Sequence, residues 1–139
     1  ASGSFAANGG IYVQSSNAQP ALSICQSDIK ASEYTLTIKA KKTGGAEGFL
    51  IPFGYKDSKN YYWLNIGGWG NSQHAIEKVT NGNKSTLMSK SGKINNNQWY
   101  EIKLVSGRDG VTCYLDSTLL FLVPGAPGAV TASVTEDKN

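Results

Sequence analysis

Arginine, histidine, cysteine and long hydrophobic runs are scarce in this chain of 139 residues, and each shortage argues against a class of function. The net charge is +3, but Arg108 is the only arginine and the lysines are scattered. Proteins that bind nucleic acids usually cluster their basic residues and favour arginine, so we expect no nucleic-acid partner. The sequence also has no run of about 18 apolar residues, so it predicts no membrane span.

Cysteine and histidine are too few for a metal site of ordinary spacing. His74 is the only histidine, and Cys25 and Cys113 stand far apart in the sequence. Structural zinc sites combine several such ligands at short spacings, so we predict no zinc site. Cys113 alternates with Val111 and Leu115, a pattern typical of a buried strand residue. Two buried free thiols and one disulfide are both compatible with the sequence, and we favour the thiols.

Glycine and short apolar runs, by contrast, are frequent, and their distribution predicts an all-β domain. A chain of this length with 40% hydrophobic residues can bury one core without staples, so we expect a single globular unit. Roughly ten to twelve short runs, joined by turns, favour a two-sheet antiparallel β-sandwich of the jelly-roll type. We expect residues 1–123 to form the sandwich, and residues 124–139 to be a linker or a final strand that leads to a next domain.

Two predicted strands in the first half of the chain differ in exposure. Residues 34–42 alternate between apolar and polar positions, which is typical of a strand with one solvated face. We expect this strand to end in solvated lysines, namely Lys39, Lys41 and Lys42. Residues 48–55 are apolar on both faces, with Tyr55 predicted on the face of Phe53. Pro52 cannot donate to a sheet ladder, so it predicts a bulge or an unpaired edge.

The densest group of aromatic residues lies in the stretch Asn60–Lys78, NYYWLNIGGWGNSQHAIEK. Its first half has a period of two, which places Tyr61, Trp63 and Asn65 on one face of a strand. Glycines at positions 67, 68 and 70 then permit positive φ angles, so we expect Trp69 to be exposed on a loop. From residue 73 the alternation resumes, which predicts strand, loop, strand.

These residues match the chemistry of sugar recognition. The C–H groups of a sugar ring pack on an aromatic face, while its hydroxyls bind amide, carboxylate and imidazole groups. The candidate ligand contacts are Trp69, Asn71, Gln73, His74 and Glu77, together with Tyr61, Trp63 and Asn65 on the strand and Tyr55 at the end of the preceding one. For Trp69 the alternative is packing over a sheet edge. For Tyr61, Trp63 and Asn65 it is plain core, and we expect Trp99 to be core as well.

Catalytic patterns are missing from the sequence. Glycoside hydrolysis ordinarily needs two carboxylates that flank the scissile bond, and the acids that could form such a pair, Glu77 and Glu101, lie in different predicted strands. No Ser-His-Asp spacing, phosphate loop or metal-ligand motif is present. We therefore expect a domain that is not an enzyme, with this acid pair as the alternative.

Two segments resemble a known family. The hairpin NQWYEIKLVSGRDGVTCYLDSTLL is similar to one in concanavalin A-like and laminin G-like jelly rolls. The segment YTLTIKAKKTGGAEGFLIPFGYKDSKNYYWLNIGGWGNSQHAIEK resembles the laminin G-like accessory module of bacterial α-L-arabinofuranosidases of glycoside hydrolase family 51. Together they cover about residues 34–121. The chain departs from the family in its short N-terminal part and in Asp116-Ser117, where Asp-Gly is more usual.

The resemblance implies a non-catalytic carbohydrate-binding module. Its ligand would be a plant cell-wall polysaccharide such as arabinan, arabinoxylan or a related hemicellulose or pectin, and its partner a linked catalytic domain. The alternative is a structural accessory domain that packs on the catalytic domain and binds no glycan. A bacterial protein that is secreted, periplasmic or on the cell surface, and a monomeric module, are expected. No cofactor is required, and a structural calcium, held largely by backbone carbonyls, is left open.

Overall fold

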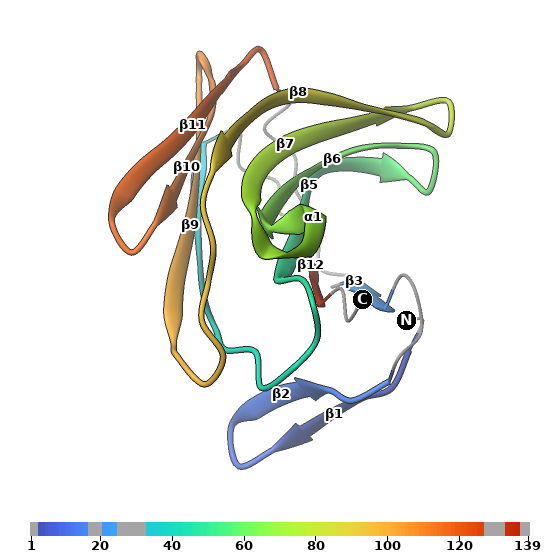
Figure 1. The fold of residues 1–139 in the computed structure, drawn as a ribbon. Helices are drawn as coiled ribbons and strands as arrows, with labels where there is room; N and C mark the ends of the chain where they lie inside the picture. Colours follow the sequence, from blue (N-terminus) through green and yellow to red (C-terminus); the bar gives the residue numbers. More distant parts are fainter. Residues whose placement is uncertain (1–2, 17–20, 25–32, 127–132, 137–139) are drawn as a thin grey trace.

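The computed structural model describes residues 3–16, 21–24, 33–126 and 133–136, which form two packed antiparallel sheets and a separate hairpin (Figure 1). The four-stranded sheet has the order β11-β10-β9-β4, with β4 at Tyr34–Ala40, β9 at Tyr100–Gly107, β10 at Gly110–Leu115 and β11 at Thr118–Pro124. The six-stranded sheet has the order β3-β12-β5-β6-β7-β8, with β3 at Ala21–Ile24, β5 at Phe49–Asp57, β6 at Asn60–Gly67, β7 at Gln73–Thr80, β8 at Asn83–Ser91 and β12 at Ser133–Glu136. The separate hairpin consists of β1 at Phe5–Asn8 and β2 at Ile11–Gln14. The predicted all-β sandwich is therefore confirmed.

The core fills the space between the two sheets. The alternate residues that face inward are aliphatic and aromatic, as in Phe49, Ile51 and Phe53 of β5 and Ile102 and Leu104 of β9. Burying such side chains is the main favourable term in folding, at about 25 cal/mol for each Å² of apolar surface removed from water. The period of two in the sequence thus decides which face of each strand carries the core.

Cys113 of β10 belongs to this core. Its thiol is buried and free, and burial raises its pKa to about 12. The thiol is therefore protonated at neutral pH and has little reactivity in the folded protein. The prediction of a buried free thiol is confirmed for Cys113, while Cys25 lies outside the described residues.

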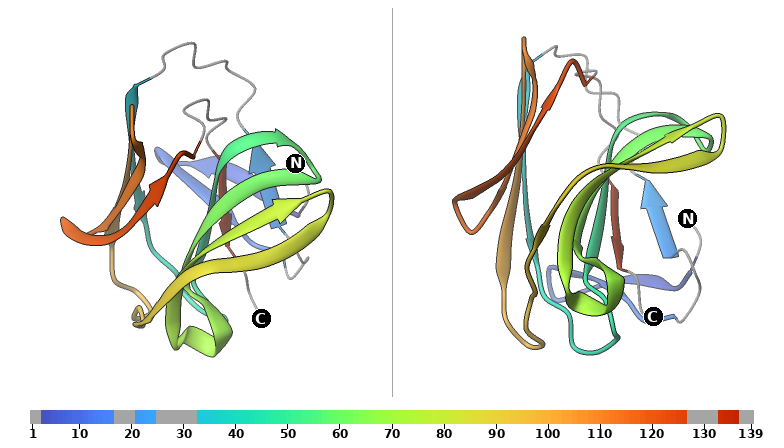
Figure 2. Two further views of the ribbon diagram at one scale, coloured as in Figure 1. Left: turned by 90° about the horizontal axis from the view of Figure 1, so that it is seen from above. Right: turned by 45° about the horizontal axis from the view of Figure 1, so that its top comes forward.

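The six-stranded sheet is strongly bent. The ends of the β5–β6 and β7–β8 hairpins turn away from the four-stranded sheet, and the views in Figure 2 show the same bend. The sheet face that points away from the four-stranded sheet is here called the outer face, and the bend makes it the concave one. Antiparallel sheets usually pack one face on the core and leave the other to solvent or ligand.

A bulge in β5 changes the expected position of Tyr55. The pairing of β5 with β6 shifts between Phe53 and Asp57, and Gly54 has a positive φ of 55°. Between these two pairs β5 has three residues where β6 has one, so the bulge adds two residues to β5 and breaks the alternation of its side chains. Phe53 stacks on Tyr62 on the core side, whereas Tyr55 stacks on Tyr61 on the outer face. The prediction that Tyr55 shares the face of Phe53 is therefore wrong.

Pro52 lies in an interior strand at a point where its neighbour β12 forms no pair with it in the described residues. On one side it pairs with Trp63 of β6. On the other side, β12 pairs only with Leu50 and Phe49 within the described residues. A missing N–H is tolerated where no strand accepts it, which explains a proline in this place.

Two predictions about exposure are wrong. Lys42 was expected in solvent, but it is buried and its ammonium donates to the carbonyl oxygens of Gly45 and Glu47 at 3.0 and 2.8 Å. These two carbonyls replace water as acceptors and fix the loop before β5. Trp99 was expected in the core, but 48% of its surface is exposed, and the ammonium of Lys41 lies 5.0 Å from its ring centre. Tyr100 takes the inward position at the start of β9, where it alternates with the core residues Ile102 and Leu104.

The last described strand completes the six-stranded sheet. Strand β12 pairs with β3 on one side and with β5 on the other, so the sheet includes residues on both sides of the boundary expected after Val123. No helix in the described part of the chain has the length and apolar composition of a membrane span.

Candidate functional site

Three aromatic rings lie side by side on the outer face, near the free ends of the β5–β6 hairpin. The ring centres of Tyr55 and Tyr61 are 5.7 Å apart and those of Tyr61 and Trp63 are 5.5 Å apart. All three side chains are half-buried. We call these three residues the outer-face cluster. Mutual packing fixes the rings before any ligand arrives, and their remaining surface is open to solvent.

A buried carboxylate holds the tryptophan of this cluster. Glu77 lies opposite Trp63 on β7, and its Oε2 accepts the indole Nε1–H of Trp63 at 2.5 Å and the Nδ2–H of Asn65 at 3.3 Å. Its Oε1 lies 3.4 Å from the ammonium of Lys84, an exposed residue of β8 whose ammonium is also 5.3 Å from the centre of the Trp63 ring. A buried carboxylate with three donors is fully compensated for its loss of water. Glu77 therefore orients Trp63 rather than facing solvent.

Exposure on the outer face changes along the strands. Asn65, which is nearer to the β6–β7 turn, is 8% exposed, and Glu77, opposite Trp63, is 2% exposed, whereas the rings of the cluster are half-buried. Burial raises the pKa of the Tyr61 phenol, and the nearby Tyr55 and Glu77 raise it further. The Tyr61 hydroxyl is therefore a neutral hydrogen-bonding group throughout the physiological pH range. The face thus offers aromatic surface with the neutral hydroxyl of Tyr61 at its open end.

Trp69 lies at the other end of β6. It belongs to α1 at Gly68–Asn71, a single turn in which Trp69 has φ 50° and ψ 55°, the left-handed conformation. The side chain is 45% exposed, so the predicted exposure is confirmed. Trp63 precedes the end of the strand at Gly67 by four residues, or about 13 Å at the usual rise of a strand. Trp69 and the outer-face cluster are therefore separate surfaces.

Internal hydrogen bonds occupy two of the polar candidates near this turn. Asn71 Nδ2 donates to the carbonyl of Ile94 at 2.7 Å, and Asn71 Oδ1 accepts the N–H of Ile94 at 2.8 Å. His74 is buried and its Nδ1 accepts the N–H of Gly67 at 3.0 Å, while a Cβ on Gly92 would meet the imidazole. Both side chains therefore stabilise the turn, and a contact of either one with a ligand stays a prediction. Gln73, at the start of β7, is half-buried.

The two acids considered for catalysis lie on opposite sides of the molecule. Glu77 points to the outer face of the six-stranded sheet. Glu101 alternates with the core residues Tyr100 and Ile102, so it points away from the core on the four-stranded sheet. Packed sheets lie about 10 Å apart, and the two carboxylates are on the far side of each. Glycosidases hold their carboxyl groups at about 5 to 10 Å on either side of one bond, which this pair cannot do.

Metal ligands do not gather anywhere in the described residues. No three His, Cys, Asp or Glu side chains there are close enough to hold a metal ion. A calcium bound mainly by backbone carbonyls is a different kind of site, and it stays a prediction.

Sequence reasoning missed two residues of the site. Lys84 contacts both Glu77 and Trp63, but its place on an exposed, polar strand gave no signal of this. The register of β8 would have been needed, because Lys84 pairs with Val79 next to the cluster. Gly54, the bulge residue that turns Tyr55 to the outer face, could have been found, since a glycine inside a strand often marks a bulge.

No protein-family model matches the chain. An extracellular exo-α-L-arabinofuranosidase of Streptomyces chartreusis is 44% identical over 115 residues, which are 82% of this chain and 14% of that enzyme. The chain therefore spans a small part of the curated relative that it matches.

Several solved structures have a similar fold. The carbohydrate-binding module CBM66 from Bacillus subtilis superposes with a TM-score of 0.73 at 20% identity, over 98% of this chain and 89% of that one. The agglutinin CG-16 from chicken liver gives 0.62 at 18% identity over 86% and 93%, and a toad ovary galectin in complex with thio-digalactose gives 0.60 at 11% over 85% and 91%. These likenesses show that the chain has the β-sandwich fold of this module and of the galectin.

Proposed function

We propose that this chain is a non-catalytic carbohydrate-binding module, which holds a cell-wall polysaccharide and keeps a linked glycoside hydrolase close to its substrate. The outer-face cluster is the observation that carries the proposal. Three rings at 5.5 to 5.7 Å form a preformed apolar surface on a concave sheet face, and sugar rings pack on such surfaces. The phenol groups of Tyr55 and Tyr61 supply hydroxyls for hydrogen bonds to the ligand.

The ligand class rests on the relative. Its name describes an enzyme that removes arabinose, and this chain corresponds to 14% of it. Arabinan or arabinoxylan, or a related hemicellulose or pectin, is therefore the expected ligand, and an arabinofuranosidase domain is the expected linked partner. We assign that partner to glycoside hydrolase family 51 and this chain to its laminin G-like modules, on the segments quoted above. The name of the relative also supports secretion of this protein. We further propose that the module is a monomer.

Binding without catalysis fits the chemistry of the face. The carboxylate beside the outer-face cluster, Glu77, is buried, accepts two hydrogen bonds and pairs with Lys84, so it is poorly placed for proton transfer to a ligand. A binding module instead raises the local concentration of substrate around the linked enzyme.

Calorimetry of the chain against oligosaccharides of arabinan, arabinoxylan, xylan, galactan and cellulose tests the proposal. We expect binding to one class, weakened about fivefold or more in Tyr61→Ala, because loss of one stacked ring is worth about 1 kcal/mol or more. Trp63→Phe keeps the ring but removes the N–H that Glu77 accepts, so it separates stacking from orientation. Leu122→Ala, an exposed position on the four-stranded sheet, is the matched control.

Trp69 supports a second candidate, a structural module that anchors on the catalytic domain. A tryptophan with positive φ is unusual, and such conformations are found mostly at functional positions. Exposed aromatic residues are common anchors in protein interfaces. If Trp69→Ala reduces glycan affinity while Tyr61→Ala does not, the sugar binds at the α1 turn and not at the outer-face cluster. If no glycan binds, and Trp69→Ala weakens association with the arabinofuranosidase domain, the structural module is correct.

A further inference from the structure

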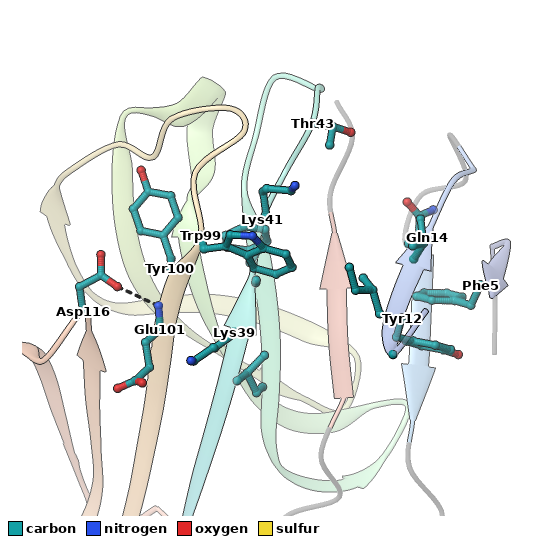
Figure 3. A pocket seen from close by; sticks show the side chains of 16 residues that line it. Phe5, Tyr12, Gln14, Lys39, Lys41, Thr43, Trp99, Tyr100, Glu101 and Asp116 are labelled. Atoms are coloured by element: carbon teal, nitrogen blue, oxygen red, sulfur yellow. Dashed lines mark hydrogen bonds between the residues drawn. The ribbon is translucent and has the colours of Figure 1, made fainter. Parts of the chain in front are cut away.

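A hollow lies between the β1–β2 hairpin and the end of the four-stranded sheet, apart from the outer-face cluster. It has a volume of about 930 Å³, within the range of small-ligand sites. Trp99, Lys41 and Lys39 line one wall and Tyr12, Phe5 and Gln14 line the other (Figure 3). We call it the hairpin pocket.

Two aromatic residues face the hairpin pocket from opposite walls. Trp99 is 48% exposed, and Tyr12 is 58% exposed. Tyr12 is held in place on two sides, because its ring stacks on Phe5 at 5.3 Å and its hydroxyl lies 2.9 Å from Ser23 Oγ of β3. A rigid aromatic surface of this kind favours a flat ligand with apolar faces.

A buried acceptor without a partner faces the same space. Gln14 lines the hairpin pocket and is only 8% exposed. Its Nε2 donates to the carbonyl oxygen of Ser16 at 2.7 Å, whereas its Oε1 has no hydrogen-bond partner in the described part of the chain. Buried polar atoms in folded proteins are nearly always bonded, so an unpaired acceptor on a residue of the pocket wall is unusual. A small rotation of the Gln14 side chain would bring its covered Oε1 to a donor of a ligand in the pocket.

The charges in the hairpin pocket balance. Lys39 and Lys41 are matched by Glu101 and Asp116, and Asp116 Oδ1 is already bonded to the backbone N–H of Glu101 at 2.8 Å. Lys39 and Glu101 pair across strands but form no ion pair in the described residues. A balanced set of charges gives no net attraction for an anionic polymer, and it leaves both donors and acceptors for hydroxyl groups.

We propose that the hairpin pocket is a second saccharide site, which takes a neutral oligosaccharide with one ring between Trp99 and Tyr12 and a hydroxyl that donates to Gln14 Oε1. The inference rests on the proposed function, because it assigns this site to the same class of ligand. Two sites on different parts of one module would bind one polysaccharide chain or two neighbouring chains with higher avidity than either alone.

Indole N–H signals of the ¹⁵N-labelled protein report the two sites in one titration. The three tryptophan signals are assigned with Trp63→Phe, Trp69→Phe and Trp99→Phe, and the probes are arabinohexaose and xylohexaose. We expect the Trp99 signal to shift with saturation, also in Tyr61→Ala. In Gln14→Met, which keeps the side-chain volume but removes the acceptor, the midpoint should move about tenfold higher. Leu122→Ala is the control, with no change expected.

The outcomes separate the inference from the proposed function. If the Trp63 signal shifts and the Trp99 signal does not, the hairpin pocket is no sugar site, while the binding module stands. If the Trp99 signal alone shifts, the second site is supported and the outer-face cluster loses its role. If neither signal moves with either probe, both proposals are overturned. An unchanged midpoint in Gln14→Met would also contradict the pocket as described, since Oε1 would then have no ligand.

Discussion

The indole Nε1–H of Trp63 donates to the carboxylate of Glu77 at 2.5 Å across neighbouring strands of the outer face. Glu77 also accepts from Asn65 and is close to the Lys84 ammonium. The carboxylate thus connects the Trp63 ring of the outer-face cluster to β6, β7 and β8. This relationship makes the stability of the sheet and the geometry of the proposed sugar surface depend on one buried charge.

Replacing Glu77 with glutamine should lower the free energy of unfolding by about 1 to 3 kcal/mol, because hydrogen bonds to a buried charge are lost. Lys84→Ala should change it by less than about 1 kcal/mol, since that side chain is 53% exposed and its ion pair is screened. Urea denaturation measures both. Equal losses in the two variants would contradict the role given to Glu77.

Replacing Gly54 with alanine should destabilise the protein by about 1 to 2 kcal/mol, because residue 54 has a positive φ of 55°. The same change should weaken glycan binding, since the bulge turns Tyr55 toward Tyr61. Thermal unfolding and calorimetric titration check the two effects. Gly44→Ala is the control, because nothing lies within 4 Å of an added Cβ there. Unchanged glycan affinity in Gly54→Ala would show that Tyr55 does not contribute to ligand binding by the outer-face cluster.

The stability of the protein should fall as the pH drops below about 6.5, through His74. Burial and the nearby Lys90 lower the pKa of the His74 imidazole in the folded state. Below pH 6.5 the unfolded chain therefore binds a proton at His74 that the folded chain does not. The resulting loss in the free energy of unfolding levels off only below the pKa of His74 in the folded state. His74→Asn keeps an acceptor near the Gly67 N–H and should flatten the slope of melting temperature against pH between 7 and 5. An unchanged slope would assign the effect to other groups.

Replacing Ser117 with glycine should stabilise the protein by about 1 kcal/mol. Asp116 and Ser117 form the two-residue turn between β10 and β11 with φ angles of 46° and 65°, a conformation that glycine adopts without strain. Asparagine tolerates positive φ, so Asn81→Gly at φ 52° is a control that should gain less. Melting temperatures of the two variants give the comparison, and a larger gain in Asn81→Gly would contradict the argument.

The periodic part of the sequence predicts the fold well. The alternation in residues 60–66 assigns Leu64 and Ile66 to one face and Trp63 to the other, as the structure has them. Glycines at 67, 68 and 70 predict a turn that exposes Trp69, which also holds. These features depend on local periodicity and on backbone sterics, so they are readable without tertiary contacts.

Tertiary contacts decide the features that the sequence did not predict. Tyr55 changes face because of one positive φ angle, which neither residue type nor period specifies. Lys42 is buried because two carbonyl groups of a loop meet its ammonium. Trp99 is exposed because the inward position of β9 goes to its neighbour Tyr100. The partners of Glu77 likewise depend on the register of β6, β7 and β8, which is known only once the pairing of these strands is known.

Strand β12 lies between β3 and β5, so an early strand and the last described strand pair at one edge of the six-stranded sheet. During synthesis, β3 has no neighbour within this sheet until β12 emerges from the ribosome. Strand β3 can therefore pair with β12 only after most of the domain has been synthesised. Pairing between strands so far apart in the sequence slows folding. The hairpins β5–β6 and β7–β8 can form earlier because their contacts are local. We therefore expect assembly of this domain to begin with these hairpins and to reach the β3–β12 pair late.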